Sequence, residues 1–120
     1  MMFGFGKRFK GVDKKFVKTP EIIDDYNSSE AIGRVRLGKL YFYYKDLGTK
    51  FYVPYDYIDR VYTKEEMVQP DDSPPYFYYR IMLRHGDKDF ANLIFEKKEL
   101  VEKVYEKLRQ IAPEIKYGLE

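Results

Sequence analysis

The chain has 120 residues, of which 44% are hydrophobic, and this is enough to build one hydrophobic core but not a second. Its 13 Tyr and 9 Phe, with no Trp, favour β-strands over helices. The absence of Cys excludes disulfides, thiolate zinc sites and a cysteine nucleophile, and it fits a cytoplasmic location. The net charge is +2, but the chain beyond its basic first eighteen residues is mildly acidic and gives no electrostatic signature of nucleic-acid binding. No stretch has the pattern of a membrane span or signal peptide.

Residues 1–20 are expected to form an N-terminal arm, because Gly4, Gly6, Gly11 and Pro20 work against a regular helix. The first eighteen residues carry a net charge of +5, and the remainder of the chain carries −3. Two interpretations of the arm stay open: its phenylalanines pack on protein while its lysines stay solvated, or both groups bind an anionic membrane surface. The candidate contact residues of the arm are Phe3, Phe5, Lys7, Arg8, Phe9 and Lys10.

A single domain is expected from residue 21 to residue 120. After a short helical turn, alternation of apolar and polar residues predicts several strands, which are separated by Gly-containing turns. A polar loop is expected after the fourth of these strands, because this segment contains three prolines, which do not fit inside a sheet. The predicted segments are the turn at 21–26, the strands at 31–37, 40–44, 50–53 and 58–63, and the loop at 65–75.

The second half of this domain is expected to be a hairpin followed by a helix. Strands at 76–84 and 89–95 flank the turn signal His85-Gly86-Asp87, and apolar residues then recur at helical spacing over 97–111. Pro113 ends that helix. The predicted core consists of Phe77, Tyr79, Ile81, Leu83, Leu93, Leu100, Val104 and Leu108.

One segment carries a family resemblance. The residues IGRVRLGKLYFYYKDLGTKFYVPYDYIDRV, in which Pro54, Ile58 and Val61 form a Pro-x-x-x-Ile-x-x-Val step, resemble the first half of GRAM and bacterial pleckstrin-homology (PH)-like domains. The second half of the chain is compatible with the same pattern, so the resemblance covers about residues 30–112. It implies a mainly β, α+β fold: a PH-like split barrel of about six or seven antiparallel strands capped by one C-terminal α-helix.

The same resemblance implies only a broad range of functions, because this superfold carries lipid-head-group, peptide-binding and purely structural roles. Members that bind phosphoinositides use a Lys near the end of the first strand and a basic-x-basic pair beyond a long loop. In this chain Arg34-x-Arg36 precedes Gly38, and the turn is short. The sequence therefore departs from the head-group pattern.

Candidate catalytic and metal-binding residues are few. The chain has one His and no Cys, and His85 is interpreted as an exposed turn residue. The acidic pairs Asp24-Asp25 and Asp71-Asp72 lack the alternating carboxylates and central Gly of a calcium loop. We therefore expect no enzyme activity, no cofactor and no metal site.

Two aromatic clusters, at 41–44 and 76–79, each send alternate rings to opposite faces of a strand. Core packing and cross-strand pairing explain these rings, and the alternative is a binding face with neighbouring basic residues. The candidate contacts on this outer face are Arg34, Arg36, Tyr78 and Arg80. The sequence-based hypothesis is a cytoplasmic, non-catalytic binding or scaffolding module for protein contact or homo-oligomerisation. The alternative is a peripheral membrane adaptor whose basic arm binds anionic lipid, and nucleic acid is not an expected partner.

Overall fold

The computed structural model describes residues 8–119, and it divides the chain into two compact units, the first ending at Tyr55 and the second starting at Asp56. Over the described residues the chain is mainly β, with two sheets and two α-helices. The mainly β prediction is confirmed, whereas the described strands form two separate sheets instead of a closed barrel, and a second helix joins the expected one. Compact units of this kind can belong to one domain, so the predicted single domain stays a prediction.

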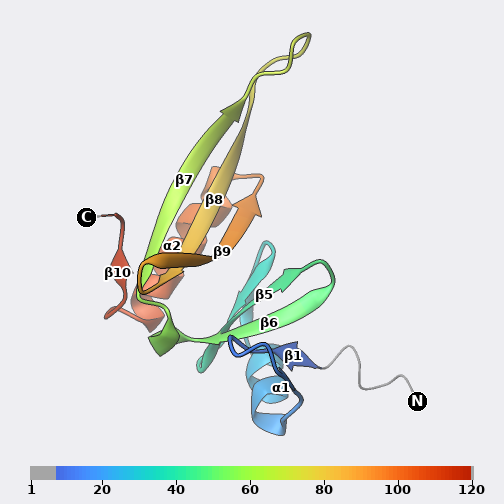
Figure 1. Cartoon of the computed structure of the whole chain (residues 1–120), viewed down its shortest axis with the longest axis vertical. Coiled ribbons are helices and arrows are strands. Elements are labelled where there is room, and N and C mark those ends of the chain that lie inside the picture. The colour runs from blue at the N-terminus through green and yellow to red at the C-terminus, as the bar shows by residue number, and fades with distance from the viewer. Residues whose placement is uncertain (1–7, 120) are drawn as a thin grey trace. The chain divides into compact units, whose positions relative to one another are not determined.

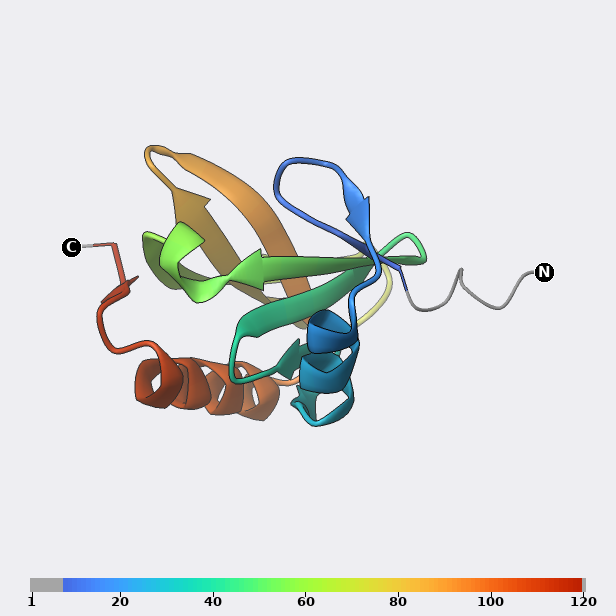
Figure 2. The same ribbon diagram turned by 90° about the horizontal axis from the view of Figure 1, so that it is seen from below.

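Unit 1 combines helix α1 (Pro20–Asn27) with a sheet of short strands, in which α1 packs beside β5 (Figure 2). β1 runs parallel to β6, and the other neighbours are antiparallel. The predicted strand at 31–37 is instead a hairpin, because Gly33 adopts a φ of 59° and turns the chain. The order across the described sheet is β2 (Phe16–Val17), β1 (Phe9–Lys10), β6 (Thr49–Pro54), β5 (Tyr41–Asp46), β4 (Val35–Leu37) and β3 (Glu30–Ile32).

The described part of the arm belongs to this sheet. Phe9 pairs with Val17 across the β1–β2 hairpin, and its side chain is only 2% exposed. It forms a core cluster with Ile22 of α1 and Tyr43 of β5. Burial of such a ring contributes about 1.5–3 kcal/mol toward holding this segment on the sheet.

Asp25 of α1 is a buried carboxylate that holds the turn between β4 and β5. Its Oδ1 accepts hydrogen bonds from the backbone N–H groups of Lys39 (2.9 Å) and Leu40 (3.1 Å). Its Oδ2 accepts from the Tyr41 N–H (3.2 Å) and the Tyr43 hydroxyl (2.7 Å). A Cβ at Gly38 would collide with this carboxylate, so the close approach requires glycine there.

We predict that Asp25→Ala lowers the free energy of unfolding by about 2–4 kcal/mol, because it leaves several buried donors without an acceptor. Urea denaturation measures the loss. Asp24→Ala is the matched control, since Asp24 is the exposed neighbour and its removal should cost less than about 0.5 kcal/mol. Equal losses for the two variants would contradict this role of Asp25.

Unit 2 combines helix α2 (Lys98–Ile111) with a second sheet, preceded by the 3₁₀ turn η2 (Tyr55–Tyr57). The order across the described sheet is β10 (Lys116–Tyr117), β7 (Arg60–Val68), β8 (Tyr76–His85) and β9 (Lys88–Phe95). β7 and β8 are the long strands, and Figure 1 shows them extending past the end of β9. The last residue of β9, Phe95, lies opposite Tyr79.

The core of unit 2 lies between α2 and the sheet. The predicted core residues Ile81, Leu83, Leu93, Val104 and Leu108 are at most 2% exposed, which confirms them, and Tyr79 and Leu100 are half-buried. The prediction was wrong for Phe77, which is 43% exposed because it lies on the part of β8 that extends past β9.

We predict that Leu108→Ala costs about 2–5 kcal/mol of stability, because the truncation leaves a cavity between α2 and the sheet. Chemical denaturation checks it against Leu40→Ala, whose side chain is 47% exposed and should matter little. A loss below about 1 kcal/mol for Leu108→Ala would mean that α2 contributes little to the core.

Candidate functional site

The outer edge of β7 is only partly covered by another strand. β10 pairs in parallel with β7 at Arg60 and Val61, where the Gly118 N–H donates to the Val61 carbonyl at 2.8 Å. No other described strand lies on this side of β7. The edge is therefore uncovered over the rest of the strand, up to Val68.

The backbone of β7 points alternate residues toward this open edge. Val61 directs its carbonyl outward to Gly118, and residues two, four and six positions later share its orientation in an extended strand. These are Thr63, Glu65 and Met67. Among the described residues, none of their backbone groups has a strand partner on the open side. Such a row of unpaired donors and acceptors is a template for another strand.

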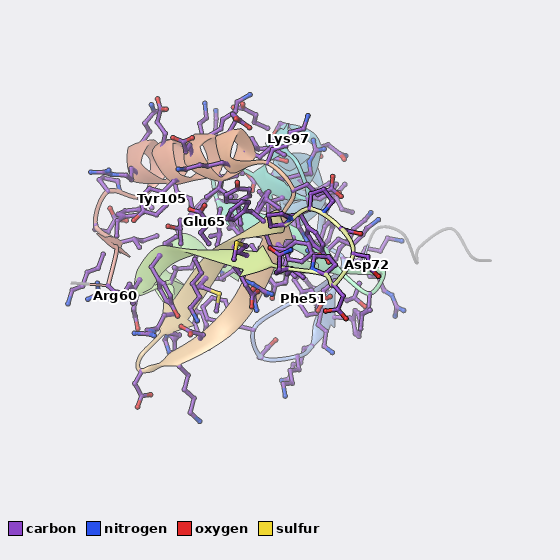
Figure 3. All side chains as sticks on the ribbon, turned by 90° about the horizontal axis from the view of Figure 1, so that it is seen from above. Phe51, Arg60, Glu65, Asp72, Lys97 and Tyr105 are labelled. Carbon is purple, nitrogen blue, oxygen red and sulfur yellow. The ribbon has the colours of Figure 1, made fainter. Side chains whose placement is uncertain are left out.

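A groove of about 690 Å³ lies along the same edge, between the sheet and α2. Figure 3 labels Glu65 on β7 and Tyr105 on α2, which both line it. This volume is in the range of ordinary ligand sites in proteins. The lining residues are Thr63, Lys64, Glu65, Tyr79, Lys98, Val101, Glu102, Tyr105, Glu106, Arg109 and Gln110.

The groove has apolar groups between charged sides. Val101 is buried, and Tyr79 and Tyr105 are half-buried, so apolar surface faces the open edge of β7. Beside the groove, the Tyr117 ring of β10 packs edge-on against Tyr105, with ring centroids 5.2 Å apart. Burial, together with the neighbouring Tyr105, raises the pKa of Tyr117 to about 12, so this ring stays neutral at physiological pH.

Exposed apolar side chains continue beyond the groove along the β7–β8 hairpin. Met67 is 57% exposed and lies opposite Phe77, and Phe77 stacks along the strand on Tyr79 at 6.5 Å between ring centroids. The Tyr79 ring also lines the groove. The apolar surface and the unpaired backbone edge therefore run in the same direction.

The sequence-predicted contacts of the arm fall in unit 1 or outside the described residues. Phe3, Phe5 and Lys7 lie outside them. Arg8 is exposed, and its guanidinium lies 5.0 Å from the Phe16 ring centroid. Phe9 was expected as a partner contact, but burial in the core removes its side chain from the surface.

Lys10 and the two arginines of the predicted outer face also belong to unit 1. Lys10 is half-buried, with its Nζ 5.9 Å from the Phe51 ring centroid. The Arg34 guanidinium donates to the Lys45 carbonyl at 2.9 Å. Arg36 is half-buried and donates to the hydroxyl (2.8 Å) and carbonyl (3.0 Å) of Ser29.

Tyr78 and Arg80 belong to unit 2, where the structure places them on the face of β8 opposite α2. Arg80 forms an ion pair with Glu66 at 2.8 Å and donates to Asn92 at 3.0 Å. Tyr78 packs edge-on against Tyr76 at 5.4 Å between ring centroids. The predicted outer-face residues are thus divided between the two units, and Arg80 has an internal carboxylate partner.

His85 is exposed at the β8–β9 turn, as the sequence predicts, and one side of its ring packs against unit 2. Its ring stacks on Tyr57 with ring centroids 3.8 Å apart, and its Nδ1–H donates to the Tyr57 carbonyl at 2.7 Å. Asp59 lies 3.5 Å from the same nitrogen. Within residues 8–119, no group of three or more His, Cys, Asp or Glu side chains is arranged to hold a metal ion.

The edge of β7 was missed by sequence reasoning. The sequence predicts a strand at 58–63 and a polar, proline-containing loop at 65–75, whereas β7 continues to Val68 through the three consecutive charged residues Lys64, Glu65 and Glu66. Charged residues are typical of edge strands, so the same three residues are compatible with the exposed edge that the structure shows.

No known protein family, curated protein or solved structure matches the chain. In the described part of the chain, neither helix combines the length and apolar character needed to cross a bilayer.

Proline substitutions test which residues of β7 direct their backbone N–H groups toward the open edge. We predict that Glu65→Pro costs at least about 1 kcal/mol less stability than Lys64→Pro, because the Lys64 N–H faces β8 and bonds in the ladder opposite Arg80, whereas the Glu65 N–H faces outward. Thermal or urea unfolding of the two variants measures this difference. A larger loss for Glu65→Pro would show that the outward residues have been assigned wrongly.

Proposed function

We propose that the protein is a non-catalytic binding module that takes up an extended peptide segment of a partner protein along the open edge of β7. The observation that supports this most directly is the unpaired backbone of Thr63, Glu65 and Met67 beside the groove under α2. An added strand satisfies these backbone groups, and its alternate side chains reach the groove.

The backbone edge of β7 and the groove beside α2 contribute to binding in different ways. Main-chain hydrogen bonds to β7 contribute affinity with little dependence on sequence, whereas the apolar groups of Val101 and Tyr105 select side chains. The charged sides, with Lys98 and Arg109 beside Glu102 and Glu106, favour a peptide of mixed charge over a strongly acidic or basic one.

The chain's own C-terminal strand supports the proposal. β10 is only two residues long, yet it docks in parallel on the same edge of β7, and Arg60 fixes its end by donating to the Gly118 carbonyl at 2.5 Å. The edge therefore accepts a short extended segment. A partner segment continues the row of hydrogen bonds from Thr63 onward.

The proposal includes the finer fold suggested by the sequence, a PH-like arrangement, because antiparallel strands β3 to β9 follow one another along the chain before α2. A cytoplasmic location is part of the same proposal. The segment that pairs with the open edge of β7 can also come from another copy of this chain, which is the homo-oligomer form of the hypothesis. The adaptor that binds lipid through its basic arm stays a prediction.

The experiment is a selection of linear peptides from a displayed library on the purified protein, followed by affinity measurements on two variants at one position. Glu65→Pro removes the outward donor, and we expect it to weaken peptide binding at least about tenfold. Glu65→Ala removes the same carboxylate but keeps the N–H, so it should bind within about threefold of the unchanged protein.

Equal binding by both variants, or a selection that enriches no peptide, would contradict strand addition at β7. Sedimentation at increasing concentration separates the homo-oligomer, because self-association through this edge should be lost in Glu65→Pro and kept in Glu65→Ala.

A further inference from the structure

The turn between β5 and β6 contains a fully exposed leucine. Leu47 is 98% exposed and adopts a φ of 49°, and Gly48 follows with a φ of 82°. A two-residue turn with two positive φ values is the type I′ hairpin turn, for which Asn-Gly and Asp-Gly are preferred. Leucine is unfavourable there because its Cβ is strained at a positive φ.

The same turn has a second unfavourable feature. Lys45 and Lys50 lie directly opposite each other across the β5–β6 hairpin, and like charges in this position destabilise a sheet. Burial lowers the pKa of Lys50, and the nearby charges of Lys45 and Arg36 lower it further. Local features that oppose folding are expected where a site serves binding.

Other basic residues lie at this end of the sheet. Arg34 follows Gly33 in the β3–β4 turn and donates to the Lys45 carbonyl. Arg8 precedes β1, which runs parallel to β6 from the same end of the sheet, with Lys10 opposite Phe51. The acidic residue of the β5–β6 turn itself is Asp46. Figure 2 shows this turn projecting from the sheet.

We propose that this end of unit 1 docks on an anionic lipid bilayer, with Leu47 inserted between the lipids and Arg8, Arg34, Lys45 and Lys50 against the head groups. A bilayer fits both features, because its interior takes up the leucine and its negative surface attracts the basic residues at this end of the sheet. The proposal concerns unit 1 alone and does not rest on the peptide groove.

The first test uses vesicles of phosphatidylcholine with and without phosphatidylserine. The protein should bind only vesicles that contain phosphatidylserine and should dissociate as salt rises. Leu47→Asn should weaken this binding about tenfold. The same substitution should raise the urea midpoint of unfolding, because Asn tolerates a positive φ better than Leu. A loss of binding with a gain of stability is not expected from a structural leucine.

A matched pair of double variants tests the charges. Lys45→Gln with Lys50→Gln should weaken binding about thirtyfold, at about 1 kcal/mol for each contact. Lys14→Gln with Lys15→Gln removes the same charge from the β1–β2 loop, which leaves β1 toward the opposite end of the sheet, and it should weaken binding less than threefold. The chain has no Trp, so the emission of Leu47→Trp should shift to shorter wavelength only with phosphatidylserine vesicles.

The proposal is wrong if the protein does not bind these vesicles, if Leu47→Asn binds as tightly as the unchanged protein, or if the two double variants lose equal affinity. It is also wrong if the Lys45 and Lys50 changes abolish binding to a single-stranded oligonucleotide while vesicle binding is unaffected, since the basic end then serves nucleic acid.

Discussion

Backbone hydrogen-bonding groups must be paired with protein or with water, and both units are organised by this constraint. In unit 1, the β4–β5 turn presents three N–H groups to the inside, and the buried Asp25 carboxylate of α1 accepts all three. Tyr43 adds its hydroxyl, and the Tyr55 hydroxyl donates to the Gly38 carbonyl at 2.6 Å. In unit 2 the same constraint is met only in part, because β10 ends after two residues while β7 continues to Val68. The remaining groups are available to a partner.

The two units differ in charge as well as in site. Up to Tyr55 the chain has eleven basic and six acidic residues, a net charge of +5, whereas from Asp56 it has eleven basic and fourteen acidic residues, a net charge of −3. The positive charge of unit 1 includes the lysines of the β5–β6 turn, and the groove of unit 2 carries both signs. Together the two proposals describe an adaptor that holds a peptide at an anionic membrane surface. Each proposal rests on residues of one unit, so each can be tested independently of the other.

Sequence reasoning worked best where one face of an element is buried. Ile81, Leu83 and Leu93 alternate along their strands, and Val104 and Leu108 recur at helical spacing, so burial fixes their positions and the pattern reveals it. The alternation along β8 does not reveal how long β9 is. The exposure of Phe77 depends on where β9 ends. Asp25 is one of two adjacent aspartates with the same local sequence, and only its contact with a turn fourteen to sixteen residues away distinguishes it from Asp24. The open edge of β7 likewise depends on where β10 docks, which no local pattern encodes.

The central claim is that a partner strand pairs with the outward residues of β7. Amide hydrogen exchange followed by NMR, with and without a selected peptide, tests it most directly, because it resolves single residues along the strand. The account predicts that the peptide slows exchange at Thr63, Glu65 and Met67, while Lys64 and Glu66, whose N–H groups already bond to β8, change little. Equal slowing at all five amides, or protection confined to residues away from β7, would contradict the account.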